Sequence, residues 1–159
     1  MKIKYVAPLV VVRDIDVAKK FYRDVLLRKI VMDFGENVTF TGGFSIQQKA
    51  LWSKFIDRKE EEIINGANDF ELYFEVEDLD EFLLYLNKYP HVVLVHPLKE
   101  YSWGQRVIRI YDPDKNIIEI GESMKTVILR LLKQGMTIED VSTKTMHPIS
   151  IIEKYKNKS

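Results

Sequence analysis

The amino-acid sequence predicts an α+β protein built from two tandem βαβββ modules and a C-terminal helical extension. The order strand, helix and three strands occurs twice, over about residues 3–48 and again over about residues 70–122. Val12-Arg13-Asp14 and Val76-Glu77-Asp78 are similar and occupy the same place in the two copies, which indicates a duplicated module. Because a four-stranded sheet with one helix leaves a face bare, we expect the modules to combine around a cavity, within one chain or across a dimer.

Each element of the first module follows from a local pattern. Residues 3–12 are strand-like, and Asp14 or Asp16 can cap a helix whose apolar stripe includes Val17, Phe21 and Val25. Three short strands follow, over residues 30–33, 37–41 and 44–48. Within the linker 49–69, residues 49–66 are charged and predict a helix that ends at Asn65-Gly66.

The second module repeats this order. Residues 70–78 alternate strictly and predict a strand, residues 80–89 predict an amphipathic helix ended by Pro90, and residues 91–96 predict another strand. Residues 101–122 predict a hairpin, because strand formers flank the turn residues Asp112 to Asn116.

The hairpin has one apolar face and one mixed face. Centring its turn near Asp114 places Arg109 opposite Glu119 and Tyr111 opposite Ile117. A face with charged and aromatic residues is typical of a sheet that lines a ligand cavity.

Composition limits the possible functions. The chain has 159 residues, 46% of them hydrophobic, which suits one domain with a small appendage. Its 24 Lys and Arg balance 24 Asp and Glu, so no overall field favours nucleic acid, and no Cys is present for a disulfide, a thiolate zinc site or a nucleophile. With neither a signal peptide nor an apolar run of about 18 residues, we expect a cytoplasmic protein without membrane contact.

Residues 123–159 lie outside the repeat. Residues 124–132 carry a helical apolar stripe, Thr137 and Asp140 predict a capping box, and Pro148 suits a helix start. The three short helices imitate a helix-turn-helix unit, but the small positive charge is weak for DNA, so we do not expect a nucleic-acid partner. The alternative is an extension that packs on the domain or on a second subunit.

Several motifs resemble those of the vicinal oxygen chelate superfamily. They are Val12-Arg13-Asp14 followed by Ala18-Lys-Lys-Phe21-Tyr22, Phe74-Glu-Val-Glu-Asp78, and Tyr111-Asp-Pro-Asp-Lys-Asn-Ile-Ile-Glu119. That group includes glyoxalase I, bleomycin-resistance proteins, fosfomycin-resistance enzymes and extradiol dioxygenases. The resemblance covers roughly residues 3–122, and it implies the fold of paired βαβββ modules without specifying a reaction.

The resemblance also implies where a divalent metal ion would bind. The matching ligand positions are Ala7, Gln47, Glu71 and Glu119, and the Ala7 methyl group cannot coordinate a metal. Two carboxylates and an amide would suit Mg²⁺ or Mn²⁺ better than Zn²⁺. If the protein is an enzyme, Glu71 and Glu119 are the candidate catalytic residues. The alternative is a polar lining without metal, in which Glu119 pairs with Arg109, and Glu71 bonds to Tyr73, Gln47 or another cavity group.

The leading hypothesis is a small-molecule-binding protein of the glyoxalase and bleomycin-resistance type, without a complete metal site. Its ligand-binding residues would be Gln47, Tyr73, Trp103, Arg109 and Tyr111, although the aromatic ones are almost equally typical of a core. We interpret His96 as a surface or loop residue. The rivals are a metal-dependent lyase or isomerase and a ligand sensor with a helix-turn-helix-like tail. We expect a homodimer, because apolar strand residues and the helical tail both need partners.

Overall fold

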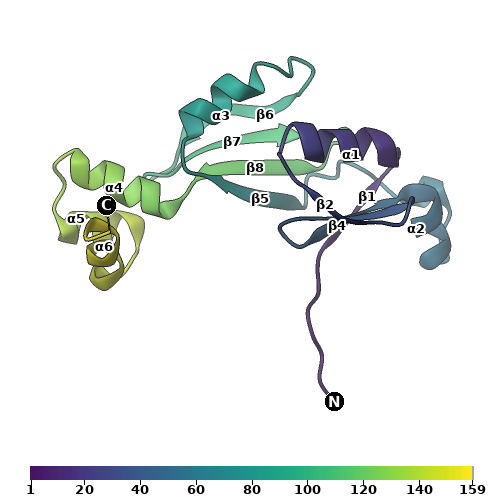
Figure 1. The fold of residues 1–159 in the computed structure, drawn as a ribbon, viewed down its shortest axis with the longest axis horizontal. Helices are drawn as coiled ribbons and strands as arrows, with labels where there is room; N and C mark the ends of the chain where they lie inside the picture. Colours follow the sequence, from purple (N-terminus) through teal and green to yellow (C-terminus); the bar gives the residue numbers. More distant parts are fainter. Residues whose placement is uncertain (159) are drawn as a thin grey trace. The chain divides into compact units, whose positions relative to one another are not determined.

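The computed structural model describes residues 1–158, which group into two compact units. The first unit contains residues 1–70 and 111–117, and the second contains residues 71–110 and those from Ile118 onward. Each unit holds one four-stranded sheet, so the predicted fold class is confirmed (Figure 1).

In chain order the elements are β1 (Leu9–Val12), α1 (Ile15–Asp24), β2 (Ile30–Asp33), β3 (Asn37–Phe40), β4 (Phe44–Gln48), α2 (Lys49–Phe55), the 3-10 turn η1 (Glu60–Glu62), β5 (Glu71–Val76), α3 (Leu79–Leu86), β6 (Leu94–Glu100), β7 (Arg106–Tyr111), β8 (Ile117–Glu122), α4 (Met124–Lys133), α5 (Ile138–Thr145) and α6 (Ile149–Lys156).

The first unit packs α1 on a sheet with the strand order β1-β4-β3-β2. The Asp14 side chain caps α1 by accepting hydrogen bonds from the amides of Asp16 and Val17. The buried core includes Tyr22, whose ring lies 5.2 to 5.6 Å from those of Phe40 and Phe44. These aromatic contacts fix the helix on the sheet.

The hairpin turn after β7 belongs to the first unit. The buried Tyr22 hydroxyl donates a hydrogen bond of 2.8 Å to Asp112, and Asp114 accepts from the backbone amide and side chain of Arg13. Burial and the nearby Asp112 raise the pKa of Tyr22 well above its ordinary value, so the phenol stays a donor.

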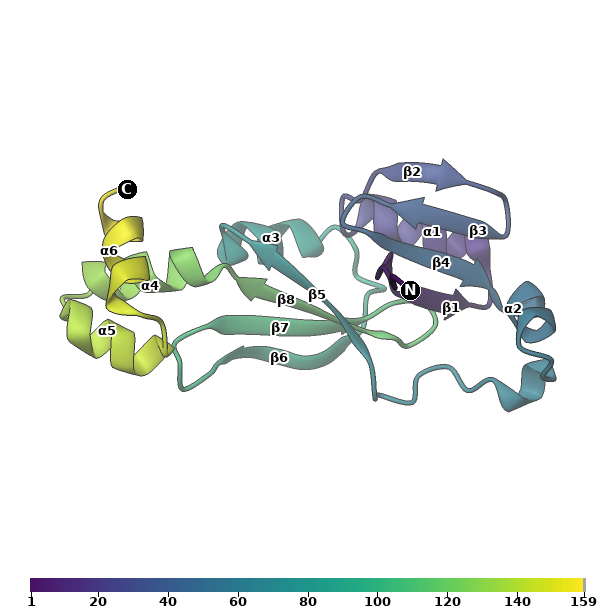
Figure 2. The same ribbon diagram turned by 90° about the horizontal axis from the view of Figure 1, so that it is seen from below.

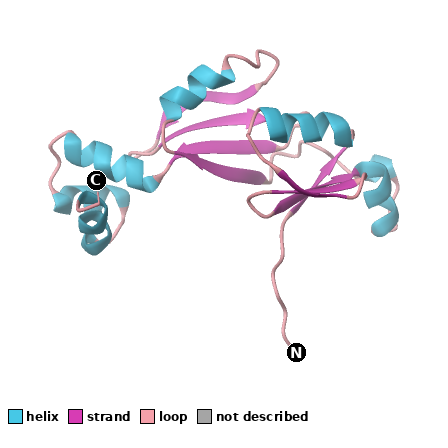
Figure 3. Cartoon of the chain, in the orientation of Figure 1, coloured by secondary structure: helices cyan, strands magenta, loops and turns pink. Residues whose placement is uncertain are grey.

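The second unit has the strand order β5-β8-β7-β6, with α3 on one face (Figure 3). Asp78 caps α3 through the amide of Glu81, as Asp14 caps α1 in the repeat. The apolar hairpin face predicted from the sequence is buried, through Ile108, Ile110, Ile118 and Ile120. Arg109 and Glu119 therefore lie on the opposite face.

The C-terminal helices α4, α5 and α6 gather at the end of β8 (Figure 2). Their buried residues form a core of their own, made of Val127, Ile128, Leu131, Val141 and Ile152. Ser123 and Thr137 cap α4 and α5, and Pro148 lies directly before α6. The three predicted helices are confirmed. None of the helices in residues 1–158 combines the length and apolar character needed to cross a membrane.

Three predicted boundaries were wrong. The first strand begins at Leu9, where its pairing with Ser45 of β4 begins, and residues 3–7 lie outside it. The linker helix ends at Phe55, before Asp57 with a φ of 51°, and does not reach Asn65-Gly66. The strand predicted over residues 91–96 is β6, which runs to Glu100 and tolerates Pro97 because it is an edge strand.

Candidate functional site

Arg109 on β7 is the centre of a charged cluster on the second sheet. Its Nε donates a hydrogen bond of 2.9 Å to Glu71 on β5, and its neighbouring Nη2 donates to Glu119 on β8. Its Nη1 donates to the Tyr101 hydroxyl at 2.6 Å and lies 3.3 Å from Nε2 of His96. One guanidinium therefore joins groups from all four strands and the loop after β6.

The predicted pairing of Arg109 with Glu119 is confirmed. Of the partners predicted for Glu71, neither Tyr73 nor Gln47 bonds to it, and its partner is another of the predicted cavity residues. Glu71 bonds to Arg109, because a long arginine side chain can reach across β8 to the neighbouring strand. Burial lowers the pKa of Arg109, but its bonds to Glu71 and Tyr101 more than offset this, so its pKa lies above the ordinary value. The guanidinium is thus permanently charged.

Two stacked rings lie next to Arg109 and form an aromatic wall made of Tyr101 and Trp103. Their centroids are 4.6 Å apart and their planes 4° apart. The Trp103 indole donates a hydrogen bond of 3.0 Å to Oε1 of Gln105. Nε2 of Gln105 donates in turn to the Tyr73 hydroxyl and to the Glu122 carbonyl, both at 2.9 Å. Every polar atom of the buried Gln105 amide is satisfied, which makes the wall rigid.

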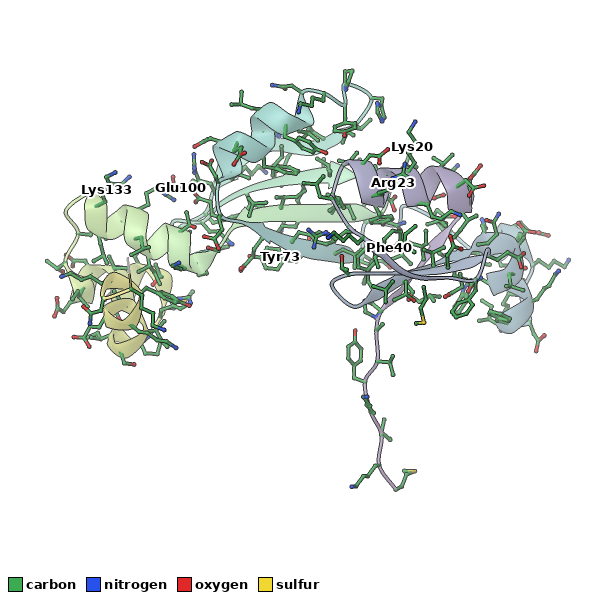
Figure 4. All side chains as sticks on the ribbon, viewed as in Figure 1. Lys20, Arg23, Phe40, Tyr73, Glu100 and Lys133 are labelled. Atoms are coloured by element: carbon green, nitrogen blue, oxygen red, sulfur yellow. The ribbon has the colours of Figure 1, made fainter. Side chains whose placement is uncertain are left out.

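Tyr73 and Glu75 extend the same polar face along β5. Tyr73 is labelled on this strand in Figure 4. The Tyr73 hydroxyl donates to Glu75 at 2.9 Å, and the Tyr73 side chain is about half exposed. Burial and the adjacent Glu75 raise the pKa of Tyr73 to about 12, so the phenol is neutral at physiological pH. Gly121 makes room for this arrangement, since a Cβ there would lie 2.9 Å from Gln105 and 3.2 Å from Tyr73.

Gln47 and Tyr111 belong to the first unit. Gln47 is 2% exposed, donates through Nε2 to the Glu36 carbonyl at 2.8 Å, and accepts from Asn37 at 2.9 Å. The Tyr111 hydroxyl donates to Asn68 at 3.0 Å. Both side chains are held by neighbours in their own unit. The shared cavity that the sequence suggested stays a prediction.

The residues present do not fit the divalent metal ion that the resemblance implies. The two carboxylates at matching positions, Glu71 and Glu119, both bond to Arg109, whose positive charge opposes that of a metal ion. Ala7 offers no donor, and both ends of the Gln47 amide are engaged. Within residues 1–158, no three His, Asp or Glu side chains gather closely enough to hold an ion.

Sequence reasoning missed three members of this cluster, His96, Tyr101 and Gln105. His96 reaches Arg109 because the two residues are cross-strand partners in the β6–β7 ladder. The predicted strand 91–96 contained His96, but its register with β7 shifts on both sides of His96, which no sequence pattern indicated. Tyr101 and Gln105 begin and end a tight turn, in which the Tyr101 amide donates to the Gln105 carbonyl at 2.9 Å.

A separate groove of about 580 Å³ lies on the α3 side of the second sheet. Its lining is mostly apolar, from Leu83, Leu84 and Leu86 of α3 to Leu94 and Ile108 of the sheet. None of the predicted site residues lines it. The charged and aromatic face around Arg109 is therefore the candidate functional site.

Comparison with known proteins places this fold in a family. A protein of unknown function from Agrobacterium tumefaciens is 40% identical, with a TM-score of 0.67 over 77% of this chain and 96% of the other. A lactoylglutathione lyase from Agrobacterium tumefaciens is 21% identical (TM-score 0.59, 77% and 96% covered). A glyoxalase/bleomycin resistance protein/dioxygenase from Nocardioides is 14% identical (TM-score 0.62, 77% and 85% covered), and these last two show the fold alone.

No protein with a curated description matches the chain. The model of the glyoxalase-like domain family matches residues 5–125, which include both sheets and the cluster around Arg109. The chain therefore belongs to the glyoxalase-like domain family.

Proposed function

We propose that this protein binds a small, flat organic cation on the polar face of its second sheet, without a metal ion. The observation that carries this proposal is the Arg109 guanidinium between Glu71 and Glu119, at the position where the superfamily resemblance implies a metal. A resident, permanently charged side chain there supports binding rather than Lewis-acid chemistry.

Charge supports a cationic ligand. Three carboxylates, from Glu71, Glu75 and Glu119, share this face with the single guanidinium of Arg109. The Glu71 side chain is 40% exposed, so it can pair with a ligand while it still holds Arg109. An excess of negative charge next to a partly buried arginine favours a cation over an anion.

The aromatic residues support a flat ligand. Tyr73 is about half exposed, and the parallel rings of Tyr101 and Trp103 are fixed before any ligand binds. Rings of this kind attract a cation by about 0.5 to 1 kcal/mol each and offer apolar contact area. Because the rings are already ordered, binding loses little side-chain entropy.

A matched pair of probes tests this proposal. N-methylacridinium is a flat cation, and anthracene-carboxylate is a flat anion of similar size; both report binding by fluorescence anisotropy. We expect the cation to bind and the anion to bind much more weakly, with an affinity for the cation that falls as salt is added. Glu71→Gln should weaken cation binding about tenfold, roughly 1.4 kcal/mol. Glu61→Gln, an exposed change in the first unit, is the matched control and should have no effect.

Metal content separates this proposal from the rival lyase. Cation binding should be unchanged by EDTA, and protein purified without added metal should contain no stoichiometric divalent ion on elemental analysis. A stoichiometric ion that is lost in Glu71→Gln, together with turnover of methylglyoxal and glutathione, would support a metal-dependent lyase instead.

A further inference from the structure

The loop that carries the aromatic wall is a tight turn between β6 and β7. The Tyr101 amide donates to the Gln105 carbonyl at 2.9 Å, and the Gly104 amide donates to the Tyr101 carbonyl at 2.8 Å. Gly104 has a φ of 88°, which L side chains rarely adopt. The loop has a defined conformation, so whatever holds it also sets the position of Tyr101 and Trp103.

The C-terminal helices press directly on this loop. A Cβ built on Gly104 would lie 3.2 Å from Lys144 of α5 and 3.3 and 3.4 Å from Leu131 and Val127 of α4. Leu131 and Val127 are buried members of the three-helix core. The glycine thus allows the loop to approach the helices more closely than any other residue would.

Arg130 of α4 fastens the contact. Its Nη2 donates to the Gly104 carbonyl at 2.5 Å and to Glu122 at 2.9 Å. Glu122 is fully buried and also accepts from the backbone amide and the side chain of Arg106. Burial alone would raise the pKa of Glu122, but the bonds from Arg106 and Arg130 outweigh it and hold this pKa below its ordinary value.

These contacts form a continuous connection from the tail to the candidate site. Arg130 holds Gly104 and Glu122, and the Glu122 carbonyl accepts from Gln105. Gln105 accepts from the Trp103 indole, and Trp103 stacks on Tyr101, which bonds to Arg109. Each step is a direct hydrogen bond or ring contact within the second unit.

We infer that the C-terminal helices support the ligand site. Arg130 is the positioning residue, and it holds the Tyr101–Gln105 loop in its binding conformation. The family model ends at residue 125, so this support comes from a segment added to the glyoxalase-like domain. The inference rests on the proposed function, because it assigns Arg130 a role at the same site.

The test compares Arg130→Met with Arg130→Lys, and with Lys133→Met as an exposed control on the same helix. All variants carry Trp52→Phe, which leaves Trp103 as the only tryptophan. Acrylamide quenching of Trp103 reports the loop, thermal unfolding reports the fold, and anisotropy of N-methylacridinium reports the site.

We expect Arg130→Met to remain folded, to expose Trp103 to more quenching and to weaken cation binding about tenfold. Arg130→Lys should recover part of both signals, since it can still donate to one of the two acceptors, and Lys133→Met should change neither. If Arg130→Met folds and leaves quenching and affinity unchanged, the inference is overturned.

Gly104→Ala covers the case in which Arg130→Met does not fold. Its methyl group pushes the loop away from α4 and leaves Arg130 in place, so it too should increase quenching and weaken binding. Unchanged values in folded Gly104→Ala would overturn the inference.

The proposed function and the role of Arg130 can fail separately. If wild-type protein does not bind the cation, the proposed function fails. The Trp103 quenching series then still decides whether Arg130 positions the loop.

Discussion

At the residue scale, Arg109 determines what this site can do. Its pairing with Glu119 was predictable, because cross-strand neighbours in a hairpin follow from the position of the turn. Its bond to Glu71 was not, because Glu71 lies on a strand far away in the sequence that joins β8 only in the folded sheet. His96 was missed for a related reason, since its register with Arg109 depends on an edge strand that continues through a proline.

Replacing Arg109 should change the metal chemistry of the site. In Arg109→Met, Glu71 and Glu119 lose their shared cation, and the poorly exposed Glu119 is left unpaired, which should cost about 3 kcal/mol of stability. The two carboxylates then lose the positive charge that opposes a divalent ion, and their oxygens become free to bind one. We expect Mn²⁺ to raise the melting temperature of Arg109→Met and not that of wild-type protein.

Differential scanning fluorimetry with and without Mn²⁺ measures this effect. The double variant Arg109→Met/Glu71→Gln is the control and should lose the response to metal. A wild-type protein stabilised as strongly as Arg109→Met would contradict the view that the guanidinium keeps the ion out.

At the element scale, the repeat predicted one helix in each module, and the cap of the first helix was predicted at Asp14 or Asp16. Asp14 and Asp78 occupy the same position in the two copies, and both side chains accept hydrogen bonds from amides in the first turn of the next helix. Local chemistry of this kind is visible in a sequence. Strand ends were predicted less well, because a strand continues only as far as its partner does. Residues 3–7 show this, since the pairing of β1 with β4 begins only at Leu9.

The two caps should contribute similar amounts to stability. Asp14→Ala and Asp78→Ala should each lower the free energy of unfolding by about 1 kcal/mol, because each leaves first-turn amides without an acceptor. Urea denaturation followed by circular dichroism measures both. Asp69→Ala, a change of an exposed residue in a loop, serves as the control. Losses well below 0.5 kcal/mol in both cap variants would show that solvent replaces the caps at little cost.

At the scale of the whole molecule, the N-terminal segment exposes several large apolar side chains of the first unit. Ile3, Tyr5 and Val6 are 87%, 77% and 81% exposed, and the segment runs away from its own sheet (Figure 1). Apolar side chains at such exposure favour association. The homodimer expected from the sequence therefore stays a prediction, and the N-terminal segment is the surface through which we expect it to form.

Deleting residues 1–7 should shift a dimer toward monomer. Because Pro8 and β1 remain, the sheet of the first unit should keep its fold, which circular dichroism can verify. Sedimentation velocity over a range of concentrations measures the change in mass. A wild-type protein that is monomeric at all concentrations, or a dimer unaffected by the deletion, would contradict this prediction.

The sequence by itself determined the duplicated modules, the caps of α1 and α5, the apolar hairpin face and the pairing of Arg109 with Glu119. These features depend on residues that are close together in the chain or on a repeated pattern. Only the tertiary structure decided that Glu71 and His96 also converge on Arg109, that Gln47 is occupied by its own strand neighbours, and that Arg130 of the tail supports the aromatic wall. Those contacts join segments distant in sequence, and their partners are selected by strand order and packing. A local sequence pattern does not determine either of these.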